Sequence, residues 1–435
     1  HWLAKELRFD IARLPVKACP RLADFIRRMR AKGVSLVFSS YHLSAPASTF
    51  GHTLLRIHKH RLGSDGRAQD LLDDGINFAA TRTDSFPLLY VVRGLAGSYE
   101  GYFRRMPYSY KIREYNDFEN RDLWEYRLDL SPEVLGQLVL HIWELADAKF
   151  DYYFLTENCS YHVLGALEAA DPSLDLLEHI RDPVVPVDTV RALYANPGLV
   201  REVTFRPSAH RVFHTRVVDL DGDVTAFIDE LASDPDAAIP EGWSEDLRIR
   251  ALDAAVDLVE LRHAKEVLTE PESEPSKAKQ RLLERRAAIQ RPSPRLVVHR
   301  PEAEEPTGGH HSARIGLGAG ASWSAGEAPD LSAPFTDLNL RLVLHDLADP
   351  SLGYPELAQM EFSPTRLRYL PKQRTFRLDD YSLVSLVSLR PFGRFTQKAS
   401  WLARVGTQTR DDPGCGPAGC IAAHAQMASG ITLAT

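Results

Sequence analysis

The sequence feature that most constrains the fold is a series of six segments after residue 312 in which apolar and polar residues alternate. A period of two places alternate side chains on opposite faces of a β-strand. Gly-rich turns separate the segments, so we expect an antiparallel β-meander, which as a soluble domain would be a sandwich or a periplasmic sheet. An incomplete barrel is the alternative, because repeated segments of roughly ten alternating residues are also typical of outer-membrane proteins. The six segments are 312–323, 336–347, 358–370, 381–392, 398–409 and 422–434.

The preceding part of the chain mixes predicted helices and strands. Residues 34–40, 50–60 and 71–80 have strand-like composition, and together they predict antiparallel pairing. Residues 81–130 are rich in aromatic residues and Arg, and we expect an excursion over a cleft followed by a strand. Apolar residues at helical spacing predict a helix before residue 33, with Gly33 as its left-handed stop.

Two further helices are expected in the middle of the chain. Ser131 is a favourable N-cap, and Pro132 fits the first helical position of the helix that follows it. A second helix is expected to begin at about Cys159 and to end before Asp171, which precedes a proline.

Length and charge limit the kind of protein. A chain of 435 residues is too long for one ordinary core, so we predict four parts. These are a helical segment over 1–33, a mixed domain over 34–200, a charged helical linker region over 201–295, and a β domain over 296–435 that is truncated because the sequence stops within a strand-like segment. The net charge of −7 argues against nucleic-acid binding, and no run of eighteen apolar residues predicts a membrane-spanning helix.

Four cysteines are present, and two of them lie in the Gly/Pro-rich stretch "DDPGCGPAGC". This turn brings Cys415 and Cys420 close enough to form a disulfide, which would indicate an oxidising compartment such as the periplasm. Cys19 is interpreted as a structural thiol. Cys159 differs because it opens the helix predicted in "FLTENCSYHVLGALEAAD".

A cysteine at a helix N-terminus is either a small buried apolar residue or a nucleophile. The helix dipole and unpaired N–H groups stabilise a thiolate there, and neighbouring N–H groups can bind an oxyanion. A catalytic thiol also needs a base. His162 lies one turn further along the same helix face and is interpreted as a packing residue, whereas His52 begins a predicted strand. Asn77 can orient the His52 ring, with Asp73 and Asp74 as competitors.

The order His52, Asn77, Cys159 is that of a permuted papain arrangement. The stretches "SSYHLSAPASTFGHTLLRI", "INFAA" and "FLTENCSYHVLGALE" resemble the Lnb-type N-terminal periplasmic domain of Gram-negative bacteria over roughly residues 34–200. The "NC" helix start is more distantly similar to lecithin:retinol acyltransferase-like enzymes. The resemblance implies an α+β fold, with a permuted papain-like domain of antiparallel sheet plus helices.

The resemblance also implies roles for individual residues. Cys159 would be the nucleophile and His52 the general base, with Asn77 or Asp74 as the third member. Asn158 and Ser160 would support the turn or the oxyanion hole. The expected substrate wall consists of Tyr41, Ser44, Ser48 and Tyr161.

The activity implied by the resemblance is N-acylation of lipoproteins at the outer membrane, through a thioester on Cys159. The acyl donor would be a membrane phospholipid, the acceptor a lipoprotein N-terminus, and no cofactor or metal is expected. A papain-like hydrolase (peptidase, amidase or lipase) is the main alternative. A non-catalytic envelope binding or scaffold module is the second.

Overall fold

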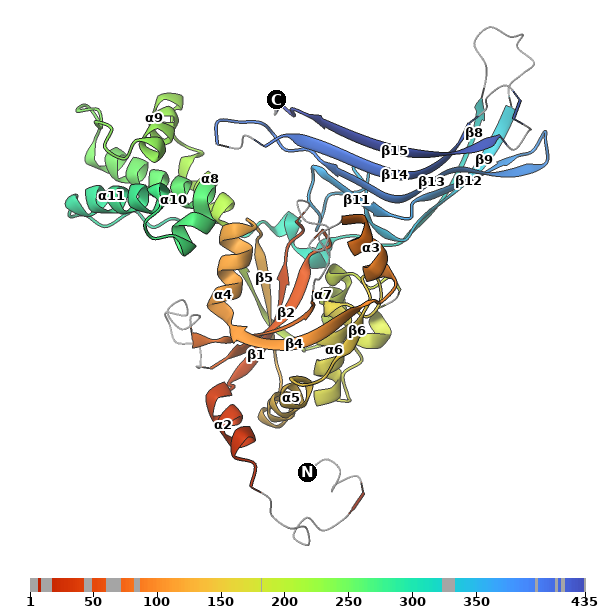
Figure 1. Cartoon of the computed structure of the whole chain (residues 1–435), viewed down its shortest axis with the longest axis horizontal. Coiled ribbons are helices and arrows are strands. Elements are labelled where there is room, and N and C mark those ends of the chain that lie inside the picture. The colour runs from red at the N-terminus through yellow and green to blue at the C-terminus, as the bar shows by residue number, and fades with distance from the viewer. Residues whose placement is uncertain are drawn as a thin grey trace.

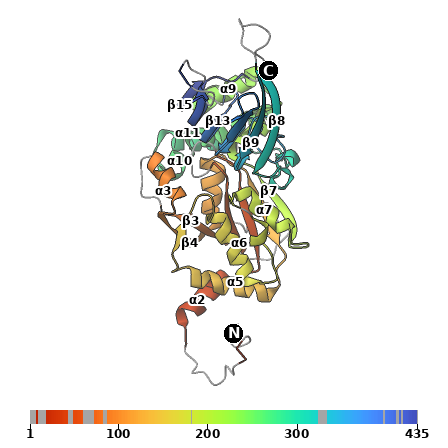
Figure 2. The same ribbon diagram turned by 90° about the vertical axis from the view of Figure 1, so that its right-hand side faces the viewer.

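The fold consists of two antiparallel sheets and a separate group of helices, seen in a computed structural model of the chain (Figure 1). The α+β class expected from the sequence is therefore confirmed. The second sheet and the helical group lie at one end of the first sheet, opposite the N-terminal helix α2 (Pro20–Met29) (Figures 1 and 2). The structure describes residues 7–8, 18–42, 49–59, 72–81, 87–180, 182–322, 333–395, 398–410, 414–415 and 419–433.

The first sheet has seven strands in the order β6-β4-β3-β2-β1-β5-β7. Every neighbouring pair is antiparallel, and β2 lies in the middle with β1 and β3 on either side. The strands are β1 (Gly33–Ser39), β2 (His52–His58), β3 (Asp74–Ala80), β4 (Tyr99–Pro107), β5 (Leu123–Leu128), β6 (Phe150–Tyr152) and β7 (Val200–Arg206).

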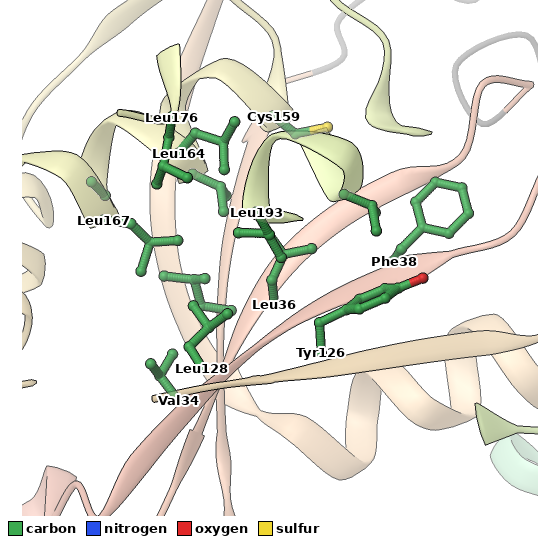
Figure 3. Close-up of a cluster of buried hydrophobic side chains, with 14 of the residues drawn as sticks. Val34, Leu36, Phe38, Tyr126, Leu128, Cys159, Leu164, Leu167, Leu176 and Leu193 are labelled. Carbon is green, nitrogen blue, oxygen red and sulfur yellow. The ribbon is translucent and has the colours of Figure 1, made fainter. Parts of the chain in front are cut away.

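Three helices cover one face of this sheet. They are α5 (Pro132–Leu145), α6 (Cys159–Ala170) and α7 (Pro186–Tyr194). Figure 3 shows their buried side chains, such as Leu164 and Leu193, meeting Leu36 of β1. Ser131 caps α5 by accepting a hydrogen bond from the Val134 N–H, as its sequence predicted.

Charged side chains are buried on the other face of the same sheet. Arg56 of β2 pairs with Asp73 and with Glu125 of β5, and its guanidinium lies 4.8 Å from the centre of the Tyr108 ring. Tyr108 begins α4 (Tyr108–Ile112), which continues as a π-helical turn, η4 (Arg113–Phe118). This ionic cluster is the central feature of the second face.

Residues 81–130 form more of the sheet than the sequence predicted. The expected excursion contains α3 (Pro87–Leu95) and then β4, which pairs with both β3 and β6. Tyr99, Gly101 and Phe103 of β4 face inward, and exposed or half-exposed residues alternate with them. The prediction of an excursion was therefore wrong for this strand, because the many Tyr and Arg residues obscured a period-two pattern.

The helix before β1 ends earlier than predicted. It is α2 (Pro20–Met29), and its C-cap is Arg30, with a left-handed φ of 44°. Gly33 instead begins β1, where a Cβ atom would meet the Arg127 side chain. The predicted left-handed stop at Gly33 was wrong.

The helical group has a core of its own, so it is more than the linker predicted. Residues such as Ile228, Leu258 and Leu282 pack together in it. The preceding β7 belongs to the first sheet, which therefore extends to Arg206 instead of ending at residue 200. The four helices are α8 (Ala209–Val217), α9 (Gly222–Ser233), α10 (Glu245–Thr269) and α11 (Glu274–Ala288).

The second sheet is the antiparallel meander expected from the alternation. Its long strand β13 pairs with β12 and β11 along one side and with β14 along the other. Its strands are β8 (Arg314–Ser322), β9 (Ala333–Arg341), β10 (Val343–His345), β11 (Ala358–Phe362), β12 (Thr365–Leu370), β13 (Thr375–Ser388), β14 (Ser400–Arg410) and β15 (Cys420–Gly430). Short 3-10 helices occur at η5 (Leu177–His179), η6 (Glu302–Glu304) and η7 (Pro306–Gly308).

Two of the six predicted β segments are each divided into two strands. The segment 336–347 contains the end of β9 and all of β10, and 358–370 contains β11 and β12. Ser363, with a φ of 51°, turns the chain between β11 and β12. Cys415 and Cys420 form the predicted disulfide, with Cα atoms 5.4 Å apart. No helix among the described residues is long and apolar enough to cross a membrane.

The second sheet packs directly against the first domain. Val343, Leu344 and Met360 are fully buried in the same apolar core as the strands of the first sheet. The Phe50 ring, just before β2, lies 4.8 Å from the Phe362 ring. This junction therefore lies next to the start of β2.

Candidate active site

Cys159 is the first residue of α6, and its helix start is held by the side chain of Asn158. The Asn158 Oδ1 atom accepts a hydrogen bond from the Ser160 N–H at 3.0 Å. Its Nδ2 atom donates to the carbonyl oxygens of Phe154 at 3.1 Å and Val184 at 2.7 Å. Asn158 therefore fixes both the helix start and the turn that leads into it.

The hydroxyl of Thr53 connects β2 to this helix start. It lies 3.0 Å from the Ser160 hydroxyl and donates to the Cys159 Sγ at 3.9 Å. Ser160 was expected to support the turn or the oxyanion hole. Its N–H is bonded to Asn158 and its hydroxyl to Thr53, so both groups hold the helix start in this structure. The Cys159 N–H is at the first position of the helix, where a backbone donor has no intrahelical acceptor.

His52 is the first residue of β2 and is oriented by Asn77 of β3. The His52 Nε2 lies 2.5 Å from the Asn77 Oδ1. An amide oxygen only accepts hydrogen bonds, so Nε2 carries the proton and Nδ1 is free to accept one from a thiol. The register of β2 and β3 pairs Leu55 with Ile76. In this register His52 and Asn77 are diagonal neighbours on the same face of the sheet.

The environment of Cys159 favours its thiolate. Burial raises the pKa of the Cys159 thiol, but the charge of His52 and a hydrogen bond with it lower the pKa more, and Thr53 adds to this effect. The net result lowers the pKa from 9.0 to about 6. A cysteine with such a pKa is mostly ionised at neutral pH, as a nucleophile requires.

Asp73 and Asp74, the other candidates for the third member, pair with cationic side chains instead of with His52. Asp74 lies at the other end of β3 and pairs with Arg105 at 2.8 Å and with Lys59 at 3.0 Å. Asp73 belongs to the ionic cluster with Arg56. Among the three candidates for the third member, Asn77 is the one in contact with His52.

His162 lies among aromatic rings, in keeping with the packing role predicted for it. Its ring centre is 4.1 Å from that of Phe78 and 4.7 Å from that of Phe150. Burial lowers the pKa of His162 to about 4, so the ring is neutral at pH 7.

A cavity of about 200 Å³ opens beside Cys159, His52 and Asn77. Its wall combines small and aromatic residues with charged side chains from the segment that follows β4. The lining residues are Phe50, Gly51, His52, Asn77, Ala79, Ala80, Lys111, Glu114, Tyr115, Glu119, Arg121, Tyr152, Phe154, Asn158, Cys159 and Pro186.

Tyr41 and Tyr161, two of the four predicted wall residues, lie elsewhere. Tyr41 stacks on Tyr354 at the junction with the second sheet, and Tyr161 packs beside the His162 ring. Neither lines the cavity. Ser44 and Ser48 lie outside the described residues.

Tyr115 is a cavity residue that the sequence analysis missed. It lies in η4, and its ring centre is 6.0 Å from that of His52. Lys111 and Arg121 each place a cationic group 5.0 Å from the ring centre. Burial raises the pKa of Tyr115 well above its ordinary value, so its hydroxyl stays protonated and can donate a hydrogen bond. The one sequence signal for its place in the cavity is the alternation of aromatic and charged residues around it.

The site is a buried thiol beside a His–Asn pair on β2 and β3, two inner strands of an antiparallel sheet, which defines an α+β domain with a Cys–His–Asn constellation. Residues 21–196 match the model of the Lnb N-terminal periplasmic domain family. The match confirms the resemblance found in the sequence. Residues 303–435 match a domain of unknown function (DUF7840), which covers the second sheet. Searches of curated proteins and of solved structures found no match.

Proposed function

We propose that this protein is a cysteine-dependent acyltransferase of the bacterial envelope that N-acylates lipoproteins with an acyl chain from a phospholipid. The observation that carries this proposal is the buried Cys159 thiol, whose pKa is lowered to about 6 beside a His52 ring oriented by Asn77. The match of residues 21–196 to a periplasmic domain family supports an envelope location, and association with the outer membrane is part of the proposal.

The first half of the reaction forms a thioester. His52 accepts the Cys159 proton through Nδ1, and the thiolate attacks the ester carbonyl carbon of the phospholipid. The Cys159 N–H and the Tyr115 hydroxyl are the donors that we assign to the resulting oxyanion. When the intermediate collapses, the ester C–O bond breaks, and the lysophospholipid oxygen leaves with the proton from His52.

The second half transfers the acyl chain to an amine. The α-amine of the lipoprotein attacks the thioester carbon, and His52 takes its proton. The C–S bond then breaks, an amide remains on the lipoprotein, and Cys159 returns as a thiolate. Neither half requires a redox step or a cofactor in this scheme.

The segment around the cavity suits a lipid substrate. Tyr110 and Phe118 are exposed and lie one residue from the cavity-lining Lys111 and Glu119. Aromatic and cationic side chains together are favourable at a headgroup interface. We therefore place the membrane surface at this side of the cavity.

Hydrolysis is the second candidate, and the charged cavity wall is the observation that favours it. Lys111, Glu114, Glu119 and Arg121 line the space beside the thiol and would retain water there. Water in place of the amine turns the same thioester chemistry into that of a peptidase, amidase or lipase. A binding module without catalysis is the third reading, and in it Cys159 would form no adduct.

The test is intact-mass spectrometry of the full chain incubated with phospholipid vesicles. The acyltransferase proposal predicts an acyl adduct on Cys159 that disappears in Cys159→Ala and His52→Ala. Adding a diacylated lipopeptide should then discharge the adduct and yield the triacylated peptide. An adduct that produces only free fatty acid would favour the hydrolase, and no adduct with any phospholipid would contradict both enzyme proposals.

A further inference from the structure

Three side chains with metal-binding groups converge beside the second sheet, outside the catalytic cavity. They are His310, His345 and Asp349. The His310 Nε2 lies 3.0 Å from the His345 Nδ1, and the Asp349 Oδ2 lies 3.5 Å and 3.8 Å from these two atoms. Bonds of about 2.0–2.1 Å in a tetrahedral zinc site separate its ligand atoms by roughly 3.4 Å. We propose that this triad binds a divalent transition-metal ion of the zinc type.

The surroundings of His310 fix the tautomer that a metal ligand needs, with the proton on one ring nitrogen and the lone pair of the other free. Its Nδ1 lies 2.8 Å from the carbonyl oxygen of His311, which only accepts hydrogen bonds. The proton is therefore on Nδ1, and the lone pair of Nε2 points toward His345. Histidine ligands of metals are commonly held in this way by a carbonyl behind the ring.

The carboxylate of Asp349 is held just as firmly. Its Oδ2 accepts a hydrogen bond from the Asp346 N–H at 3.0 Å, and Arg341 and Arg314 pair with its oxygens. Ligating carboxylates are themselves usually hydrogen-bonded. Oδ2 accepts from the Asp346 N–H and from Arg341, and Oδ1 accepts from Arg314, so a bound ion would use the remaining lone pair of Oδ1 or displace Arg341 from Oδ2.

The charges around the triad can accept a cation. Asp346 and Asp349 supply two carboxylates and Arg314 and Arg341 two guanidinium groups, while burial raises the pKa of the nearby Glu361 to about 7, so the formal sum near neutral pH lies between 0 and −1. The Arg314 side chain is 46% exposed, so solvent screens much of its charge. The Nη1 atom of Arg341, which pairs with Asp349, also lies 3.8 Å from Glu361.

The position of the triad suggests what a bound ion would do. The Tyr354 ring stacks on both imidazoles, with ring centres 4.4 Å and 4.7 Å away, and its hydroxyl donates to the His310 carbonyl oxygen at 2.8 Å. Tyr354 also stacks on Tyr41 of the first domain. An ion at the triad would therefore stabilise the junction between the two sheets. His310 is the most exposed of the three ligands, so water can complete the coordination on its side.

The experiment measures binding of Zn²⁺ and Co²⁺ to the full chain after treatment with a chelator. Cys19 and Cys159 are both changed to Ser, so that free thiols cannot bind the ion and the result is independent of the proposed catalysis. We expect one ion per chain by calorimetry and a visible Co²⁺ spectrum of tetrahedral type. Removing one ligand in His310→Ala should weaken Zn²⁺ binding by about 100-fold or more.

The matched control is His311→Ala, which removes the adjacent, exposed imidazole but leaves the triad and the His311 carbonyl in place. This variant should bind as tightly as the parent. Asp349→Asn is a second ligand variant, and circular dichroism checks that each variant is folded. The proposal is wrong if the parent binds neither ion, or if His310→Ala and His311→Ala bind Zn²⁺ equally well.

Discussion

The two faces of the seven-stranded sheet are stabilised differently: one is covered by a large apolar core, whereas the other combines a smaller apolar cluster with buried ion pairs. On one face Leu55 and Ile57 of β2 enter the apolar core beneath α6. On the other face Arg56 forms ion pairs with Asp73 and Glu125 beneath α4. Apolar packing accepts many partners of suitable volume, whereas a buried charge needs particular partners at hydrogen-bond distance.

The candidate active site draws on both faces. Alternation along β2 and β3 places His52 and Asn77 on the side of Arg56, since Ile76 and Phe78 face the apolar core. Cys159 belongs to the helix layer of the apolar side and contacts Thr53. The site therefore requires that both faces be correctly assembled.

The largest expected effect is on the ionic face. Arg56→Ala leaves the buried carboxylates of Asp73 and Glu125 without their main counter-charge, so it should lower the free energy of unfolding by about 3–5 kcal/mol. Urea denaturation measures the loss. Lys149→Ala, which breaks the exposed pair with Glu100, is the control and should change the free energy of unfolding far less, because solvent screens that pair. Equal losses in the two variants would mean that the ionic cluster does not stabilise this face.

A cavity on the apolar face should cost somewhat less. Leu164 of α6 is fully buried, and Leu164→Ala should lower the free energy of unfolding by about 3 kcal/mol through lost burial and an unfilled cavity. The same denaturation experiment compares it with Leu283→Ala on α11, where the side chain is exposed and the change should be within about 0.5 kcal/mol. A loss as small as that of the control would contradict tight packing under α6.

The next prediction concerns the residue that orients His52. Asn77→Ala removes the hydrogen bond to Nε2, so thioester formation should slow by about 10- to 100-fold, or roughly 1.4–2.7 kcal/mol. Asp74→Asn should leave this rate unchanged, because Asp74 pairs with Lys59 and Arg105 instead. Rapid-quench mass spectrometry measures both. If Asp74→Asn is the slower variant, Asn77 is not the third member.

The reactivity of Cys159 should follow its lowered pKa. Above pH 6 the thiolate dominates, and below it alkylation by iodoacetamide should fall tenfold for each unit of pH. Thr53→Val removes a hydrogen bond that favours the thiolate, so the midpoint should rise by about half a unit to one unit. A parent midpoint near 9 would refute the activated thiol.

The smallest effect is expected at His162. His162→Phe keeps an aromatic ring among Phe78 and Phe150, so the alkylation rate at pH 7 should change by about twofold or less. His52→Ala, measured in parallel, should raise the pH midpoint of Cys159. If His162→Phe raises that midpoint as much as His52→Ala, the base has been assigned to the wrong histidine.

Local signals explain what the sequence could predict. Ser131 and Pro132 mark the start of α5, and Asn158 and Cys159 mark the start of α6, because capping depends on neighbouring residues alone. The resemblance suggests Cys159, His52 and Asn77 as partners, although the sequence alone does not separate Asp74 from Asn77.

Long-range pairing explains what the sequence could not predict. Arg56 and Glu125 are 69 residues apart, and no local pattern indicates their contact. Strand β4 was missed for a related reason, since its membership in the sheet depends on pairing with β3 and β6. Tyr115 is brought to the cavity by the π-helical turn, whose geometry has no clear sequence signature.

The contacts of Cys159 with Thr53 and His52 make the thiol a chemical reporter of folding. In a partly folded chain in which α6 has not docked on β2, the thiol would lack both contacts and would react slowly at mildly acidic pH. A pulse of alkylating reagent near pH 6 would therefore label native molecules faster than such intermediates, although the native thiol is buried. This reverses the usual protection pattern of a buried cysteine and gives a direct measure of when the two faces of the sheet come together.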